Sequence, residues 1–186
     1  MYKAGDLKKG LKLEIDDEPY VIEDFEFSKP GKGQALYRCR MRNMISGNRF
    51  DRTYRSGDAF KPAALEERKM TYLFNDGQFY TFMDQQSYEQ HQLTTDQLGD
   101  DVHFLFDNLE VAVLLFRDRP IGVTLPNFVV LKVVRADPAA RGDTATNVTK
   151  LAVMENGYEL QVPAFVAEGE KIQIDTRTGA YVTRVK

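Results

Sequence analysis

Apolar and polar residues alternate with a period of two along most of this 186-residue sequence. That period is typical of half-buried β-strands, whereas amphipathic helices repeat every 3.6 residues. Turn segments rich in Gly, Asn and Asp separate the alternating runs. The pattern predicts twelve strands: Leu11–Ile15, Tyr20–Phe27, Ala35–Met41, Arg49–Arg55, Met70–Phe74, Phe79–Met83, Glu110–Phe116, Arg119–Val123, Val129–Val134, Glu159–Pro163, Lys171–Asp175 and Tyr181–Val185.

Helix is predicted in only two places, from about Thr95 to Phe106 and in a short stretch near Ala63–Lys69. Many short strands with little helix favour small barrels over a sheet built from βαβ units. The fold class that the sequence predicts is therefore all-β.

Charge is distributed unevenly, and it suggests where the chain divides. Residues 1–64 carry 13 Lys/Arg and 10 Asp/Glu, residues 65–128 carry 4 and 11, and residues 129–186 carry 8 and 7. We place domain boundaries at these shifts, which gives domains of 1–64, 65–128 and 129–186. Their lengths suit small barrels: an SH3-like first domain and two five-stranded oligonucleotide-binding (OB) domains.

Composition excludes several classes of protein. A hydrophobic content of 42% with 28% charged residues is that of a globular protein. The longest apolar run, Val111–Phe116, is too short to cross a bilayer, and residues 1–10 lack the apolar core of a signal peptide. One cysteine, Cys39, excludes an internal disulfide and fits a reducing compartment. We expect a cytoplasmic protein without a membrane segment.

No pattern of residues predicts catalysis. His91 and His103 lie in the acidic middle segment, without the spaced cysteines or third ligand of a metal site. Cys39 alternates onto the apolar face of its strand, where packing explains it better than nucleophilic chemistry. Phosphate-loop, nucleophile-elbow and zinc-protease motifs are missing from the sequence. We expect no catalytic residue, no metal and no cofactor.

A hairpin is predicted around the stretch Ser28–Ala35. Strict alternation places Val21, Phe25 and Phe27 on one face of its first strand and Ile22 on the other. Pro30-Gly31 suits the centre of a type II turn, which requires a positive φ at its third residue. A turn alone does not explain the second glycine, Gly33. Glycine on both sides of Lys32 leaves a slender tip that presents one long cationic side chain.

Arginines follow the tip on two successive strands: Arg38, Arg40, Arg42, Arg49, Arg52 and Arg55. Residues 28–61 carry nine basic and two acidic side chains, and only Asp51 lies among the arginines. The first three alternate onto one face at a spacing of about 6–7 Å, close to the phosphate spacing of a nucleic-acid strand. They could simply form a solvated outer face, but we favour phosphate contact, which positions RNA without reading its bases.

The tip sequence Lys29–Ala35 resembles the hairpin tip of the bacterial elongation factor P family. Motifs along the whole chain agree, in the family's order: Gly10-Leu11-Lys12, Glu18-Pro19-Tyr20, Thr71–Gly77, Val123–Val129, Asp137-Pro138, Gly142-Asp143-Thr144, Val162–Phe165 and Ile174–Arg184. The resemblance implies a non-enzymatic translation factor. Its fold would be an SH3-like (KOW-like) domain and two OB domains, arranged in an L like a tRNA.

The resemblance also implies partners. The factor would be a monomer that contacts both ribosomal subunits between the peptidyl and exit tRNA sites, and it would help to join consecutive prolines by positioning peptidyl-tRNA. Lys32 would be extended by a modifying enzyme. Gln34 resembles the relatives with a β-lysyl group more than those with an aminopentanol-type group, and relatives with a sugar carry arginine at the tip. Lys29, Pro30, Gly31, Gly33 and Gln34 would complete the tip.

Further RNA contacts are implied in the third domain. Gly142-Asp143-Thr144 matches a loop directed towards messenger RNA near the exit-site codon, and Tyr181 and Arg184 match RNA-facing residues. Two alternatives stay open: a related factor without this tip, and a general single-stranded RNA-binding protein or RNA chaperone. The latter needs aromatic residues on a basic strand face, whereas Tyr37 and Phe50 alternate away from or between the arginines.

Overall fold

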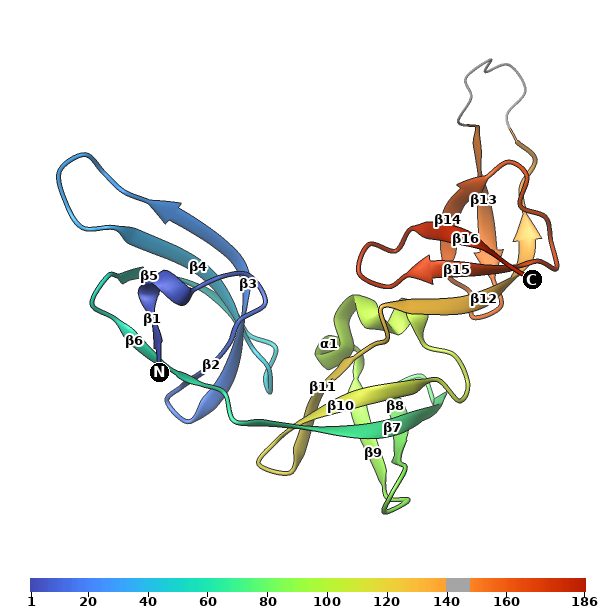
Figure 1. The fold of residues 1–186 in the computed structure, drawn as a ribbon. Helices are drawn as coiled ribbons and strands as arrows, with labels where there is room; N and C mark the ends of the chain where they lie inside the picture. Colours follow the sequence, from blue (N-terminus) through green and yellow to red (C-terminus); the bar gives the residue numbers. More distant parts are fainter. Residues whose placement is uncertain (140–147) are drawn as a thin grey trace.

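The computed structural model describes residues 1–139 and 148–186, which form three antiparallel sheets with little helix (Figure 1). The first sheet has the order β1-β6-β2-β3-β4-β5. After the short β1, residues Ala4–Asp6 form a 3₁₀ turn, η1. The strands of the first sheet are β1 (Tyr2–Lys3), β2 (Lys12–Ile15), β3 (Glu18–Ser28), β4 (Leu36–Asn43), β5 (Arg49–Arg55) and β6 (Ala59–Pro62).

The second and third sheets share one topology. Their orders are β11-β10-β7-β8-β9 and β14-β13-β12-β15-β16, so in each the first strand in sequence is central and pairs with the second and the fourth. This is the strand order of an OB barrel. The strands are β7 (Leu65–Asn75), β8 (Phe79–Asp84), β9 (Gln90–Thr94), β10 (Glu110–Phe116), β11 (Arg119–Thr124), β12 (Phe128–Ala136), β13 (Thr149–Met154), β14 (Glu159–Pro163), β15 (Lys171–Asp175) and β16 (Tyr181–Val185).

The predicted all-β class with small barrel domains is confirmed, and some predicted elements need correction. The helix expected near Ala63–Lys69 is wrong, because β7 begins at Leu65 and pairs with β10 from Leu65 opposite Phe116 onwards. Good helix formers such as Glu66 and Glu67 are overridden by this pairing. The strands β1, β6, β9 and β13 were not predicted.

The helix predicted from Thr95 to Phe106 is largely a 3₁₀ segment. Thr94 caps the helix α1 (Thr95–Leu98) in a capping box with Gln97, and the chain continues as the 3₁₀ helix η2 (Gly99–Phe104). Gly99 has a φ of +58°, which ends the α-helical turn. Leu98 and Phe104 nevertheless face the core, as expected of an amphipathic element.

A β-bulge in β3 changes which residues share its faces. The pairing with β4 shifts between Ile22 and Asp24, so one extra residue lies in β3 at that point. Ile22 is therefore buried in the core of the first domain, and Phe25 packs on the same side. Val21 points to the other side, where it packs against the second domain. The predicted pairing of Val21 with Phe25 on one face is wrong, because strict alternation cannot anticipate a bulge.

Within the described residues, three apolar clusters hold the molecule together. The first domain has its own core, which includes Leu13, Ile22, Cys39 and Met41. One larger core runs without interruption through the second and third domains. A small cluster joins the first domain to the second, where Met44 packs with Leu114, Phe116 and Ile121. Burial of Cys39 agrees with its predicted packing role.

Polar contacts reinforce both junctions. Between the first and second domains, Arg117 lies 3.4 Å from Asp17 and 3.7 Å from the buried Glu14, which also pairs with Lys61. Between the second and third domains, the side-chain amide of Asn156 donates to the carbonyl oxygens of His103 and Leu105. The first and third domains consequently rise on the same side of the second, with the β3–β4 hairpin at one end (Figure 1).

Candidate RNA-contact site at the hairpin tip

The β3–β4 hairpin extends beyond its barrel and ends in a fully exposed tip (Figure 1). The last cross-strand pair of the stem joins Ser28 and Leu36. Every residue from Ser28 to Gln34 is exposed. Lys29 and Lys32 have no ion pair within residues 1–139 and 148–186. The tip thus presents two lysine ammonium groups that no neighbouring carboxylate neutralises.

The backbone of the tip explains its second glycine. Gly33 has a φ of +140°, a conformation that glycine adopts far more readily than other residues. Gly31 does not have a positive φ, so the predicted type II turn at Pro30-Gly31 is wrong. The tip is a wider loop in which Gly33 turns the chain back. A Cβ atom at Gly31 or Gly33 would lie no closer than 3.9 Å to any atom outside its immediate neighbours, so the space beside Lys32 is open.

The arginine row lies where alternation placed it on β4. Arg38 and Arg40 are exposed, whereas Cys39 and Met41, which alternate with them, are buried. Pairing with β5 sets Arg42 opposite Arg49 and Arg40 opposite Asp51, on the same face of the sheet. Arg52 is opposite Cys39 instead, so its side chain leaves from the other face, with its guanidinium 5.3 Å from the centre of the Phe50 ring.

The arginine side chains have more ion-pair partners than the sequence suggested, because both neighbouring strands, β3 and β5, carry carboxylates beside them. Arg38 lies 3.8 Å from Glu26, and Arg40 donates to Asp51 at 3.0 Å. Arg42 donates to Glu23 at 2.7 Å. Asp51 is the only acidic residue among the arginines in sequence, but strand pairing adds Glu23 and Glu26 from β3.

Glu23 is the centre of the strongest ion pairs. It accepts hydrogen bonds from Arg42 and Arg49 and is itself only 27% exposed. Partial burial alone would raise the pKa of Glu23, but hydrogen bonds from Arg49 and Arg42 outweigh it and hold the pKa below its usual value. Charge-assisted hydrogen bonds of this kind fix side chains firmly. Arg42, whose side chain is only 19% exposed, is thus held against the fold, whereas the side chains of Arg38 and Arg49 are 70% and 59% exposed.

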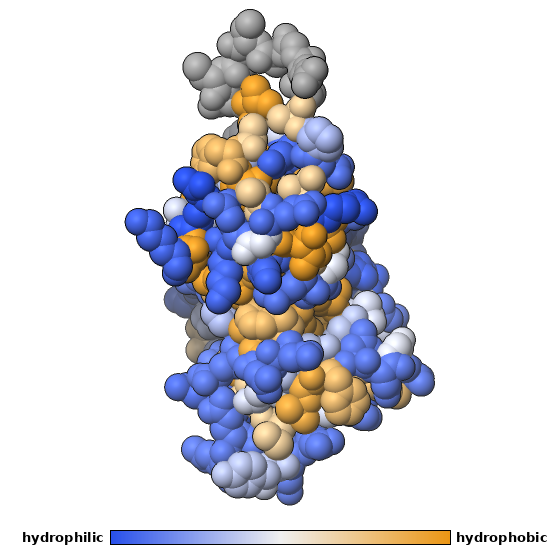
Figure 2. All heavy atoms as spheres, turned by 90° about the vertical axis from the view of Figure 1, so that its right-hand side faces the viewer, coloured by the Kyte–Doolittle hydropathy of each residue, from blue (hydrophilic) through white to orange (hydrophobic). Residues whose placement is uncertain are grey.

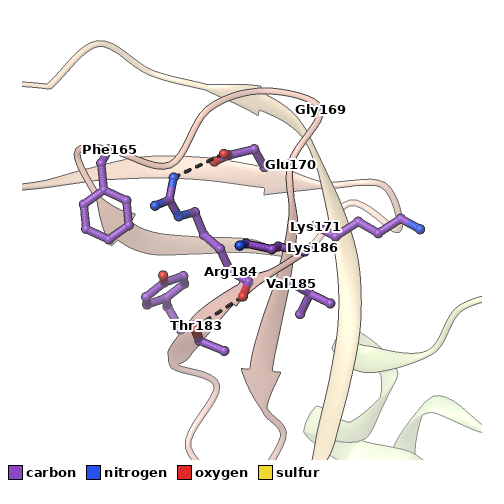
Figure 3. A pocket seen from close by; sticks show the side chains of 9 residues that line it. Phe165, Gly169, Glu170, Lys171, Thr183, Arg184, Val185 and Lys186 are labelled. Atoms are coloured by element: carbon purple, nitrogen blue, oxygen red, sulfur yellow. Dashed lines mark hydrogen bonds and ion pairs between the residues drawn. The ribbon is translucent and has the colours of Figure 1, made fainter.

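The predicted residues of the third domain lie far along the chain from the tip. Gly142, Asp143 and Thr144 fall outside the described residues. Tyr181 and Arg184 line an open pocket of about 730 Å³ beside Phe165 and Glu170 (Figure 3). The Arg184 guanidinium lies 4.7 Å from the centre of the Phe165 ring and 3.3 Å from a Glu170 oxygen.

Sequence reasoning gave no site role to Phe165 or Glu170, whose side chains both contact Arg184. Phe165 is 60% exposed, and Figure 2 shows apolar side chains reaching the surface at several separate places on this end of the molecule. Among the described residues of the third sheet and its loops, the exposed large apolar residues are Phe128, Val130, Val134, Phe165, Val182 and Val185. An exposed phenylalanine between apolar residues carries no signal of its own in a single sequence. Only the fold brings it against Arg184.

An SH3-like barrel followed by two OB barrels, with a bare cationic hairpin tip, defines a multidomain β-barrel protein whose barrel types include known oligonucleotide-binding folds. Three family models match the chain in order. They describe the elongation factor P KOW-like domain at residues 3–60, the elongation factor P OB domain at 65–123 and the elongation factor P C-terminal domain at 129–184.

Full-length relatives agree with the family models. The chain is 60% identical to a protein named elongation factor P from Desulfotalea psychrophila and 56% identical to one from Syntrophus aciditrophicus, over all of both chains in each comparison. It is also 60% identical, again over both full lengths, to a protein named elongation factor P 2 from Geobacter sulfurreducens. The chain therefore belongs to the bacterial elongation factor P family of translation elongation factors. In the described residues no helix is long and apolar enough to cross a membrane.

Proposed function

We propose that this translation factor promotes peptide-bond formation at consecutive prolines by positioning peptidyl-tRNA on the ribosome through Lys32. The observation that carries the proposal is the tip itself. Lys32 stands at the end of a projecting hairpin, exposed and without an ion-pair partner among the described residues. A lysine so placed stabilises nothing within its own domain. Its length and charge suit a contact with another molecule.

The chemistry needs a positioning device more than a catalyst. Proline has a fixed φ and a bulky ring, so its reacting groups are hard to align. Holding the two reactants in a productive geometry can recover much of the barrier to a reaction. In this proposal the ribosome remains the catalyst, and the factor supplies orientation to the end of the peptidyl-tRNA.

The proposal includes a covalent extension of Lys32. A β-lysyl-type group is favoured over an aminopentanol-type group on the residues around the tip, and a dedicated modifying enzyme would attach it. The exposure of Pro30, Gly31 and Gly33 supports access by such an enzyme, because the residues on either side of Lys32 are open to solvent.

The remaining contacts would tie the factor to both ribosomal subunits as a cytoplasmic monomer. Lys29 and the exposed arginines would hold RNA phosphates beside the tip. Tyr181 and Arg184, with the loop at Gly142-Asp143-Thr144, would face messenger RNA near the exit-site codon. Electrostatic contacts of this kind position a partner and give no sequence preference.

A reporter assay tests the proposal. Lys32→Ala should leave the melting temperature nearly unchanged, since exposed substitutions usually alter stability by no more than about 0.5 kcal/mol. It should abolish the stimulation of a reporter with three consecutive prolines and leave a proline-free reporter unaffected. The intact mass of the protein from its own host should exceed that of the unmodified chain, and the increment should vanish in Lys32→Ala. Full stimulation by Lys32→Ala would refute the proposal.

A further inference from the structure

An aromatic row runs along one face of the hairpin stem towards the tip. Strand pairing sets Phe25 opposite Cys39 and Phe27 opposite Tyr37. The ring centres of Phe27 and Tyr37 lie 5.2 Å apart, and those of Phe25 and Tyr37 lie 6.3 Å apart. This face is the one that enters the core lower down, at the buried Cys39. The row therefore continues the core out of the barrel into solvent.

Exposure rises steadily along this row. Cys39 is fully buried, Phe25 and Tyr37 are partly buried against the core, and Phe27 is 52% exposed. An exposed aromatic pair stabilises a hairpin to some extent through cross-strand packing. Packing alone, however, does not require a phenylalanine at the outermost position, where about half of its surface stays in water.

The surroundings indicate what could cover these rings. Lys29 and Lys32 lie just beyond Phe27, and the segment from Ser28 to Ala35 has no carboxylate. Glu26, the nearest acidic residue in sequence, leaves from the opposite face and pairs with Arg38. An exposed ring next to unneutralised cations is the arrangement by which proteins bind single-stranded nucleic acids, with bases stacked and phosphates held.

The size of the surface points to the same occupant. A stable protein interface covers about 800 Å² on each partner, far more than a pair of half-exposed rings can offer. One ring face matches one nucleobase. The cations also complement a phosphate rather than an apolar peptide.

We propose that Phe27, backed by Tyr37 whose ring is inclined to it by 53°, forms a stacking platform for one unpaired nucleobase at the end of the RNA that Lys32 approaches, with Lys29 against the adjoining phosphate. This inference rests on the proposed function and adds a binding site to it. The lysine gives reach and charge, and the aromatic pair fixes the orientation of the terminal base relative to the lysine.

The test uses the full chain and an RNA stem-loop with a four-nucleotide single-stranded 3′ tail. The fluorescent base 2-aminopurine stands in the tail, where stacking quenches it, and in a control RNA it stands within the paired stem. Wild-type protein should quench the tail probe only. Loss of one stacked base should weaken binding roughly 5- to 150-fold, so Phe27→Leu should show that loss, and Phe27→Tyr, which keeps a ring, should bind as wild type.

Phe74 provides a matched control. It lies on β7 of the second domain, is 49% exposed, and is not part of the tip, so Phe74→Leu should leave quenching unchanged. The melting temperature of each variant checks that the fold persists. No quenching by wild type, equal quenching by Phe27→Leu, or an equal loss in Phe74→Leu would each overturn the platform.

The two proposals can fail separately. If Phe27→Leu binds and quenches as wild type while Lys32→Ala loses the polyproline stimulation, the platform is wrong and the proposed function stands. If Lys32→Ala retains full stimulation, the proposed function is wrong whatever the quenching shows.

Discussion

Single residues at the joints between domains have unusual environments, and Asp101 is the clearest. It lies in η2, partly buried, close to Asp100 and within the electrostatic reach of Arg42 of the first domain. Burial, with a smaller contribution from the Asp100 charge, raises the pKa of Asp101 from 3.8 to about 6, although Arg42 opposes the shift. The folded environment favours the protonated carboxyl, but at neutral pH the group is ionised, and this lowers the stability of the fold.

Asp101→Asn should therefore stabilise the protein at pH 7.5. Because the folded-state pKa is above the unfolded one, the folded chain binds the extra proton between about pH 4 and 6, and wild-type stability falls as pH rises through that window. The variant should avoid this loss, with a gain of about 1–3 kcal/mol above pH 6 and almost none below pH 4. Urea unfolding at both pH values measures it.

The exposed Asp107 provides the control for this measurement. Asp107→Asn should change the free energy of unfolding by no more than about 0.5 kcal/mol at either pH. A gain in Asp101→Asn that is the same at pH 4 and pH 7.5 would show that the carboxyl titrates normally and that the stabilisation has another origin.

At the scale of elements, pairing between β3, β4 and β5 separates structural arginines from available ones. Arg42 is only 19% exposed and is held by Glu23, whereas Arg38 and Arg40 are 70% and 56% exposed. Exposed ion pairs contribute little to stability and are easily exchanged for a phosphate. The binding role predicted for the whole row should therefore belong mainly to its outer members.

Arg38→Ala and Arg40→Ala should each weaken ribosome binding and reduce the slope of log affinity against log salt by about one unit. Arg42→Ala should instead lower stability, because it leaves Glu23 with one partner fewer, and should change the salt slope little. A salt titration of ribosome binding, with melting curves of each variant, separates these effects. Equal slopes for wild type and Arg38→Ala would mean that the row is only a solvated face.

The sequence was sufficient for the elements whose pattern is local. Alternation located most strands and the faces of Arg38 and Cys39, and the Gly-Lys-Gly stretch located the tip. It failed where a distant partner decides the structure. The bulge in β3 reversed Val21 and Ile22, pairing with β10 made Leu65–Lys69 a strand, and the carboxylate facing Arg42 came from a strand nearly twenty residues away. The local sequence of a segment does not reveal which distant strand it will pair with.

At the scale of the whole molecule, the two junctions differ in kind. The second and third domains share one continuous core, and Tyr158 of the third packs against Phe104 of the second with ring centres 5.0 Å apart. The first domain has a separate core and meets the second through a small cluster and the Arg117 ion pairs. We therefore expect the first domain to fold by itself and the other two to behave as one body.

This division allows the contribution of the first domain to be isolated. If the factor acts as a ruler with the hairpin tip at one end and the third domain at the other, both ends must bind together, and each increases the effective concentration of the other. A fragment of residues 1–64 should fold around its own core and accept modification at Lys32, yet fail to stimulate polyproline synthesis at concentrations sufficient for the full chain. Because cutting the chain exposes Met44, Met44→Ser in the fragment would keep it soluble without touching the tip.

The assay adds the fragment, modified and unmodified, to a translation system that lacks the full-length factor. A second variant, Arg117→Ala in the full chain, tests the junction without removing a domain. It breaks the contacts to Asp17 and Glu14 at the edge of the small cluster, so it should retain part of the stimulation and melt within a few degrees of wild type. The opposite outcome is that the modified fragment stimulates synthesis at the concentrations at which the full-length factor works. That result would mean that the hairpin domain acts alone and that the other two domains are not needed to hold a second contact at a fixed distance from the tip.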